Sequence, residues 1–337
     1  MPRETFREVH IDRPLTNLSI AHFQSVTDFV SHRFFPVIPV LHQSDMFTFY
    51  PSGYFNKIHE SKRAEEGIAN SIGYRTTERA YSCGDDALRT FISDRKRANA
   101  DSQRMLDTEA MILIVNSLLL SKEKWFVDAF MQPGLWSQNI AGVAAAPGAN
   151  QILRWSDSAS DPVADMLAIH KEGLRIGKRK YNKAIMTLDV YNVVRNHPDV
   201  MERIKYSHSA GNPAIATLNT LAQLFELEEI LIMQTVLNTA PDGVEDPTTG
   251  LPPTTDIFMA ENKILLGYVR EGGGLMAPVA GATFVHNRYI PQGIQGGPAI
   301  RRYRDTPAKK GEYIEGEMSI DQRVTAPDLG CLITSVI

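Results

Sequence analysis

The order of segments over residues 183–240 constrains the fold more than any other feature of this sequence. A strand-like apolar run at 184–188 is followed by a valine-rich helical segment that stops at Pro198, a helical segment at 217–225, and a second strand-like run at 230–233. Short apolar runs of this kind are typical of strands buried on both faces, and capping residues mark the helices between them. The region therefore predicts a mixed α and β domain, and no catalytic sequence motif interrupts it.

Residues 101–131 predict one long helix. Apolar pairs recur every seven positions, at Met105/Leu106, Ile112/Leu113, Leu119/Leu120 and Phe126/Val127. Asp101 or Ser102 can cap the start, and Pro133 followed by Gly134 ends the helix. At about 1.5 Å per residue its length is roughly 46 Å, which is more than a small domain needs.

A second helix is expected to begin at Asp161, because aspartate is a good cap and Pro162 suits the first helical position. The basic run at 178–180 lies where this helix ends. Positive charge there interacts favourably with the helix dipole. Contact with a nucleic acid is the alternative interpretation of the same three residues.

Residues 1–45 are expected to form an arm. Isolated apolar clusters such as Phe34 and Phe35 are interrupted by Pro14, Pro36 and Pro39. Such a segment cannot bury its own apolar side chains. They need a surface to lie on, either on the rest of this chain or on a neighbouring subunit.

Residues 46–95 start with a strand-like run and then become strongly polar, with charges of both signs interspersed. The charged residues include Lys57, Glu60, Lys62, Arg63, Glu65, Glu66, Arg75 and Arg79. One interpretation is a solvated surface hairpin. The other is a long extended loop that reaches over an adjacent subunit, where charge pairing would fix the register.

The rest of the chain alternates strands and turns. The proline-containing segment 242–256 carries four acidic residues and is expected to be exposed. Strand-like runs follow at 264–269, 283–285, 319–324 and 330–336, and Pro327 separates the last two.

Composition and motifs give no support for an enzyme. Cys83 and Cys331 lie far apart and are expected to be reduced and structural, and the nine histidines form no metal-binding spacing. The segment 173–178 differs from a phosphate loop in spacing and lies inside a predicted helix. The sequence therefore predicts no catalytic residue, no cofactor and no metal. A homo-oligomeric enzyme with a dispersed site remains an alternative.

With 35 basic and 39 acidic residues, the net charge of −4 argues against a dedicated nucleic-acid binder. No apolar run of about 18 residues occurs, and the start lacks the apolar centre of a signal peptide. We therefore expect a protein that is made and folded in the cytoplasm, without membrane contact.

The order of these segments resembles the Hong Kong 97-type capsid fold of tailed-bacteriophage major capsid proteins. The local matches are Asn196-His197-Pro198, residues 221–225, Asn238-Thr239-Ala240 and residues 281–284. The resemblance implies an α+β fold. It would comprise an N-terminal arm (1–45), an extended β-hairpin loop (46–95), a peripheral domain with a long spine helix (96–182), an axial domain (183–300), and a return to peripheral strands (301–337).

The resemblance implies a structural protein of the virion capsid, assembled in the host cytoplasm. Its main partner would be itself, in hexamers and pentamers of an icosahedral shell around double-stranded DNA, which it would contact non-specifically. A portal protein would be a further partner, and a decoration protein is compatible with the fold. Because the chain enters the arm almost at once, we expect a separate scaffolding protein. The candidate intersubunit contacts are Phe34, Phe35 and the eight charged residues named above.

An encapsulin-like compartment is the rival with the same fold. Its shell would enclose protein cargo instead of DNA. Some relatives also cross-link a lysine of the extended loop to an asparagine of another subunit, but no asparagine or catalytic acid can be matched here, so that chemistry is not carried over.

Overall fold

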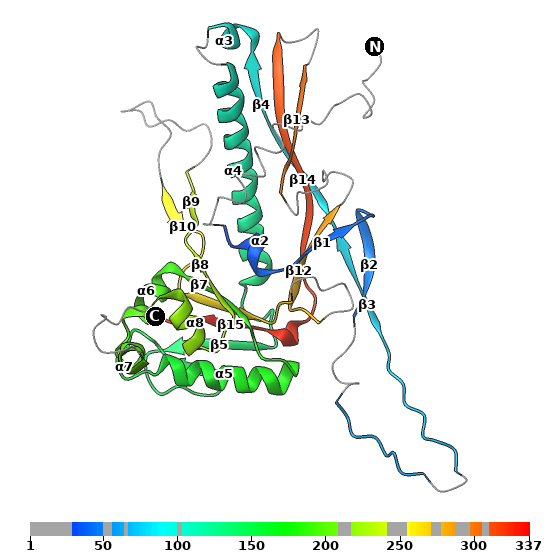
Figure 1. Cartoon of the computed structure of the whole chain (residues 1–337), viewed down its shortest axis with the longest axis vertical. Helices are drawn as coiled ribbons and strands as arrows, with labels where there is room; N and C mark the ends of the chain where they lie inside the picture. The colour runs from blue at the N-terminus through cyan, green and yellow to red at the C-terminus, as the bar shows by residue number, and fades with distance from the viewer. Residues whose placement is uncertain are drawn as a thin grey trace.

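The computed structural model describes residues 29–49, 56–63, 67–99, 103–207, 217–240, 255–270, 278–286, 297–304 and 310–337. Within them, one large sheet runs beside a long helix, a second large sheet lies at the C-terminal end of that helix, and a long loop extends away from both sheets (Figure 1). Every helix in these ranges is too short or too polar to span a bilayer.

The first sheet has six strands in the order β6-β5-β15-β11-β7-β8. Their bounds are β5 Gln138–Val143, β6 Gln151–Leu153, β7 Lys183–Thr187, β8 Glu229–Met233, β11 Lys263–Gly267 and β15 Gly330–Thr334. Successive side chains of a strand point to opposite faces, and both faces of this sheet are buried. Met186 faces one cluster of buried apolar residues, whereas Ile185 faces another.

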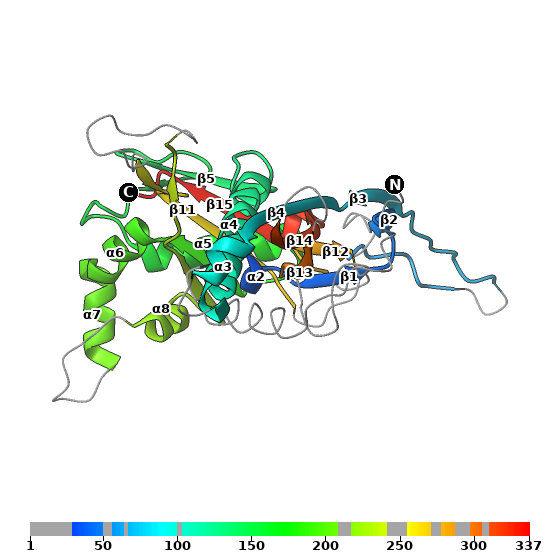
Figure 2. The same ribbon diagram turned by 90° about the horizontal axis from the view of Figure 1, so that it is seen from above.

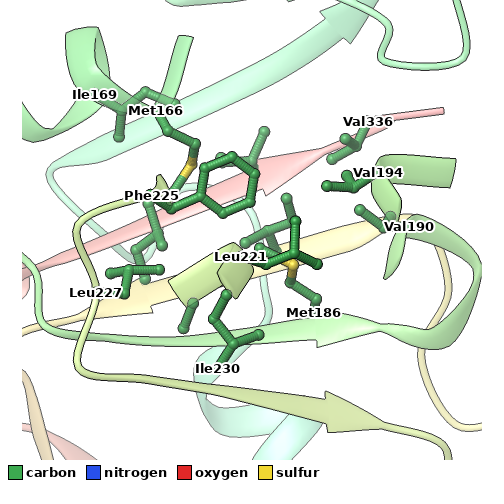
Figure 3. Packing of buried hydrophobic residues seen from close by; sticks show 14 of the residues in the cluster. Met166, Ile169, Met186, Val190, Val194, Leu221, Phe225, Leu227, Ile230 and Val336 are labelled. Carbon is green, nitrogen blue, oxygen red and sulfur yellow. The ribbon is translucent and has the colours of Figure 1, made fainter. Parts of the chain in front are cut away.

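Four helices cover the Met186 face of this sheet. They are α5 Pro162–Gly177, α6 Leu188–Asn196, α7 Pro198–Ser207 and α8 Leu218–Leu224. Figure 3 shows Met166 of α5 and Val194 of α6 converging with Phe225, at the end of α8, on Met186. The opposite face packs against the C-terminal part of the long helix, through residues such as Phe126.

The second sheet has five strands. Four of them follow the order β1-β12-β14-β13, and β4 also pairs with β14, along residues 311–320 of that strand. The bounds are β1 Val37–Val40, β4 Gly84–Ser93, β12 Gly281–His286, β13 Ala299–Arg304 and β14 Gly311–Val324. The long helix, α4 Gln103–Phe130, packs on β14. Gly316 permits this approach, because a Cβ there would lie 2.5 Å from Ile114 Cγ2.

The remaining elements are short. They are helix α2 Ser31–Phe34, helix α3 Asp94–Ala98, the 3₁₀ turn η3 Pro327–Leu329, and two separate two-stranded ribbons. One ribbon pairs β2 Ser44–Phe49 with β3 Thr77–Ser82, and the other pairs β9 Val236–Asn238 with β10 Asp256–Phe258. Seen from above, the loop beyond β2 and β3 lies at one end of the molecule (Figure 2).

Two helix starts have the side-chain caps that the sequence indicates, whereas Asp101 and Ser102, the candidate caps of the long helix, lie outside the described residues. Asp161 accepts hydrogen bonds from the backbone N–H groups of Val163 and Ala164 at 3.0 Å, and Thr217 forms a capping box with Thr220. The sequence also offers Asp189 as a cap for the valine-rich helix, but it does not cap α6. It lies in the first turn of α6 and accepts from the backbone N–H of Asn262 at 2.6 Å, so it joins α6 to the start of β11.

The predicted division of the chain at residue 183 cuts through one sheet. Strands β5 and β6, from the segment 96–182, and β15, from the C-terminal segment, all belong to the six-stranded sheet. Conversely, β12 lies in the segment 183–300 but pairs with β1 and β14 of the five-stranded sheet. Pairing between such distant strands leaves no local mark in a sequence.

Candidate assembly surfaces

The extended loop is the most exposed part of the described chain. Residues 56–63 and 67–76 leave the β2–β3 ribbon and run away from both sheets (Figures 1 and 2). The charged side chains at Lys57, Glu60, Lys62, Arg63 and Arg75 are all exposed there, whereas Glu65 and Glu66 lie outside the described residues. Asn70 Nδ2 donates a hydrogen bond across the loop to the carbonyl of Glu60 at 2.8 Å.

Apolar side chains on the same loop are also exposed, and the sequence reasoning missed them. Ile58 and Ile68 have relative exposures of 104% and 96%, and Ile72 and Tyr74 are more than half exposed. Several large apolar side chains exposed on one projecting segment indicate a surface that another molecule covers. The sequence does show single isoleucines within a polar segment. A search for hydrophobic periodicity does not detect them, because they do not recur at helix or strand spacing.

Arg79 does not belong to this exposed set. Its guanidinium carbon lies 4.1 Å from the centroid of the Phe49 ring, and its Nη1 donates to the carbonyl of Thr325 at 3.3 Å. Arg79 therefore fastens the β2–β3 ribbon to the end of β14 in its own chain. The expectation that it also contacts a neighbouring subunit stays a prediction.

Phe34 and Phe35 are likewise buried in their own chain, with exposures of 0% and 2%. The Phe35 ring lies 4.5 Å from that of Phe130 and 6.4 Å from that of Trp136, measured between centroids. Side chains so deeply buried offer no surface to another subunit. The apolar residues of the arm are expected from the sequence to pack either on the rest of their own chain or on a neighbouring subunit. Phe34 and Phe35 pack on their own chain.

A buried polar junction fixes this part of the arm to the long helix. Glu123 of α4 has no exposed surface, and its two carboxylate oxygens accept from the backbone N–H groups of Val30 and Ser31, each at 3.0 Å. Burial raises the pKa of Glu123, although the hydrogen bonds from residues 30 and 31 and the adjacent Lys122 oppose the rise. Burial also lowers the pKa of Lys122, to about 8. His32 is the third member, with a pKa lowered to about 4 by burial and by the positive charges of Lys122 and Arg33.

Arg33 connects the same segment to the six-stranded sheet. Its Nη2 lies 2.6 Å from Glu229 Oε1 on β8, and Lys183 Nζ on β7 lies 3.0 Å from Glu229 Oε2. Burial acts to raise the pKa of Glu229, but these two cations lower it on balance. The segment 30–35 thus contacts both the long helix and the six-stranded sheet, and it holds them together.

The basic run at the end of α5 has partners within the chain. Lys178 is the left-handed cap residue of α5, Lys180 forms an ion pair with Glu226, and the Arg179 guanidinium lies 5.8 Å from the Tyr268 ring. Lys178 Nζ also donates to the carbonyl of Arg175 in the last turn of α5, which favours the interpretation in which its charge stabilises the helix end.

No group of three potential metal ligands lies close together in the described part of the chain. Cys83 and Cys331 are both free and buried, as expected. Burial raises the pKa of the Cys83 thiol to about 11, so it stays protonated at neutral pH.

No model of a known protein family matches the chain. Two curated major capsid proteins are similar in sequence. One, from Burkholderia phage BcepMu, is 24% identical over 272 residues, which is 80% of each protein. The other, from Pseudomonas phage JBD67, is 22% identical over 335 residues, or 97% of each.

Several solved structures share the fold. A phage-related protein from Bordetella bronchiseptica RB50 has a TM-score of 0.70 at 18% identity, covering 97% of this chain and 98% of that one. The capsid of cyanophage P-SCSP1u gives 0.52 at 12% identity over 89% and 85%. The SrpI encapsulin of Synechococcus elongatus PCC 7942 gives 0.50 at 11% identity over 93% and 89%.

Both sequence relatives are phage major capsid proteins, and the described architecture is α+β with one long helix that packs against two sheets. The encapsulin shares the fold, but the sequence relatives favour the phage capsid. The chain is a phage major capsid protein with the Hong Kong 97-type capsid fold.

Proposed function

We propose that copies of this chain join through the extended loop into hexamers and pentamers, and that these close into an icosahedral shell around double-stranded DNA. The observation that carries the proposal is the exposed loop itself. A monomer gains no stability from the isoleucines at 58, 68 and 72, because they contact solvent instead of a core. A neighbouring copy would cover them.

Apolar and charged side chains of the loop would contribute different amounts of binding free energy. Fully burying an isoleucine side chain contributes roughly 1.5–3 kcal/mol, whereas an exposed ion pair contributes about 0–1 kcal/mol. The isoleucines would therefore hold the loop on its neighbour. Lys57, Lys62, Arg63 and their acidic partners would set its register, since charge complementarity favours one alignment over others.

In this proposal the five-stranded sheet and α4 form the periphery of each capsomer, and the six-stranded sheet with its helices surrounds the capsomer axis. The same proposal gives the protein a separate scaffolding protein, a portal protein and the packaged DNA as partners, and leaves room for a decoration protein. The net charge of −4 is consistent with a shell that encloses DNA without binding it tightly. Each contact between a basic side chain and a phosphate would add affinity for DNA, and this chain has no excess of basic residues.

The test is electron microscopy of the purified protein, alone and co-expressed with a scaffolding protein encoded beside it. Closed or tubular assemblies built from rings of subunits are the expected result. A discrete dimer or tetramer under all conditions would contradict the proposal.

The second candidate is a protein compartment, favoured by the similarity in fold to the encapsulin of Synechococcus elongatus. Purified native particles distinguish the two. Nuclease-protected DNA supports the phage capsid, whereas a co-purifying cargo enzyme without DNA supports the compartment.

A further inference from the structure

A second exposed apolar surface lies on the β9–β10 ribbon. The strands are antiparallel, with Phe258 opposite Val236 and Asp256 opposite Asn238. Because side chains alternate between the faces of a strand, these four residues share one face, called here the ribbon face. Val236 and Phe258 are 45% and 42% exposed, and Asp256 is exposed beside them.

The ribbon is well defined by hydrogen bonds. Asn238 Oδ1 accepts from the backbone N–H groups of Ala240 and Thr255 at 2.9 and 3.0 Å, and the N–H of Met259 donates to the carbonyl of Thr235 at 3.0 Å. Two strands alone are only marginally stable in water. An ordered ribbon that exposes an apolar pair is therefore suited to packing against another surface.

The ribbon lies on the left of α4 in Figure 1, and the extended loop lies on the right. That placement matters because a ring of identical subunits needs a heterologous contact, in which a patch on one side of each copy meets a different patch on the next. Two different surfaces on opposite sides of one chain satisfy this requirement.

The chemistry of the two surfaces is complementary. The ribbon face places acidic Asp256 beside its apolar pair, whereas on the loop Ile58 follows Lys57 and Tyr74 precedes Arg75. Two ribbon faces would match less well, since each carries Asp256 and neither carries a basic residue, so a symmetric contact offers the carboxylate no cation.

We infer that the ribbon face of one subunit receives the extended loop of the next copy around a capsomer. Val236 and Phe258 contact the apolar residues of the loop, and Asp256 pairs with a loop cation. This inference rests on the proposed function and names the receiving surface that it leaves open.

Cysteine cross-linking tests the contact directly, because the two native cysteines are 1% and 0% exposed and contribute little background. Phe258→Cys is combined with Ile58→Cys in one variant and with Ile72→Cys in another, and assembled particles are oxidised. The expected product is a ladder on a non-reducing gel that extends to five and six linked copies, since a heterologous contact links each copy to the next. The matched control joins Ile72→Cys to Leu174→Cys, an exposed position on α5, and gives monomer.

Particles that assemble normally but yield no linked copies from either pair would overturn the inference while leaving the proposed function intact. A product that stops at dimers would also overturn it, because it indicates a symmetric contact. Phe258→Ser provides a second measurement that does not depend on disulfide geometry. Its unfolding midpoint is expected to match the wild type, and its shell yield to fall at least tenfold. A wild-type yield would contradict the inference.

Discussion

The Glu123 carboxylate of the long helix accepts a hydrogen bond from the backbone N–H of Ser31 at 3.0 Å, and both residues are buried. A side chain of the long helix thus caps the start of a helix 92 positions earlier in the chain. This contact makes the segment from residue 29 onward part of the folded subunit and not a free arm.

Replacing Glu123 by alanine is expected to destabilise the subunit by about 2–4 kcal/mol. The substitution leaves two buried backbone N–H groups without an acceptor, each costing about 1–3 kcal/mol, and it removes the negative charge next to Lys122. Denaturant unfolding of unassembled subunits measures the change. Glu123→Gln is the matched control, because its amide oxygen can keep one hydrogen bond, and it should cost less. Equal stability of all three proteins would contradict this account of the junction.

Acid is expected to weaken the same junction through His32. The folded-state pKa of about 4 lies below the usual value of 6.5, so neutral His32 contributes stability that is complete above pH 6.5. That stability is lost as the pH falls from 6.5 to 4, by about 1–3 kcal/mol. Glu123 acts in the opposite direction, since its raised pKa adds stability on acidification.

Comparison with His32→Gln isolates the histidine, because glutamine does not titrate. The difference in unfolding free energy between the two proteins should change with pH between 6.5 and 4 and stay constant above pH 7. A difference that is independent of pH across the whole range would show that His32 does not titrate as described.

Phe35→Ala is expected to cost about 3–5 kcal/mol of subunit stability, the usual range for removing a buried aromatic side chain. The ring packs against Phe126 and Phe130, with centroids 5.8 and 4.5 Å away. Deleting residues 1–40 should therefore unfold the subunit, since it removes Phe34, Phe35 and β1 together. Circular dichroism melting measures both effects, with Phe35→Leu as a milder control. A truncated protein with a wild-type melting temperature would refute the internal role of this segment.

The loop isoleucines should affect assembly and not folding. Combined replacement of Ile58, Ile68 and Ile72 by serine is expected to leave the unfolding free energy within about 0.5 kcal/mol of wild type, because exposed positions contribute little. Shell yield, measured by sedimentation, should fall more than tenfold. Lys57→Ala with Lys62→Ala provides the comparison, and its smaller loss should depend on salt, since exposed charges are screened. A larger effect from the lysines than from the isoleucines would reverse the proposed division of roles.

The sequence located the features that depend on local chemistry. The seven-residue repeat predicted α4 to within two residues at each end, and Asp161 with Pro162 marked the start of α5. The exposure of Leu113, at 62%, shows the limit of that repeat, since one member of an apolar pair turns away from the sheet.

Features that depend on distant contacts were not predictable. Strand β4 is largely exposed and polar, so it lacks the apolar alternation of a half-buried strand, and β5 pairs with β15 from the end of the chain. For Phe34 and Phe35, the sequence established the need for a covering surface but could not choose between the same chain and a neighbour. The folded structure shows that the covering surface belongs to the same chain, because Phe34 packs against Phe126 of α4 and Phe35 packs against Trp136.

Electron cryomicroscopy of the assembled protein tests the central claim most directly. The account predicts rings of six and five subunits in a closed shell, with the six-stranded sheet nearest each ring axis and residues 56–76 of every copy lying across the next subunit. Particles in which this loop contacts only its own subunit, or a protein that remains a small oligomer with and without scaffold, would contradict it.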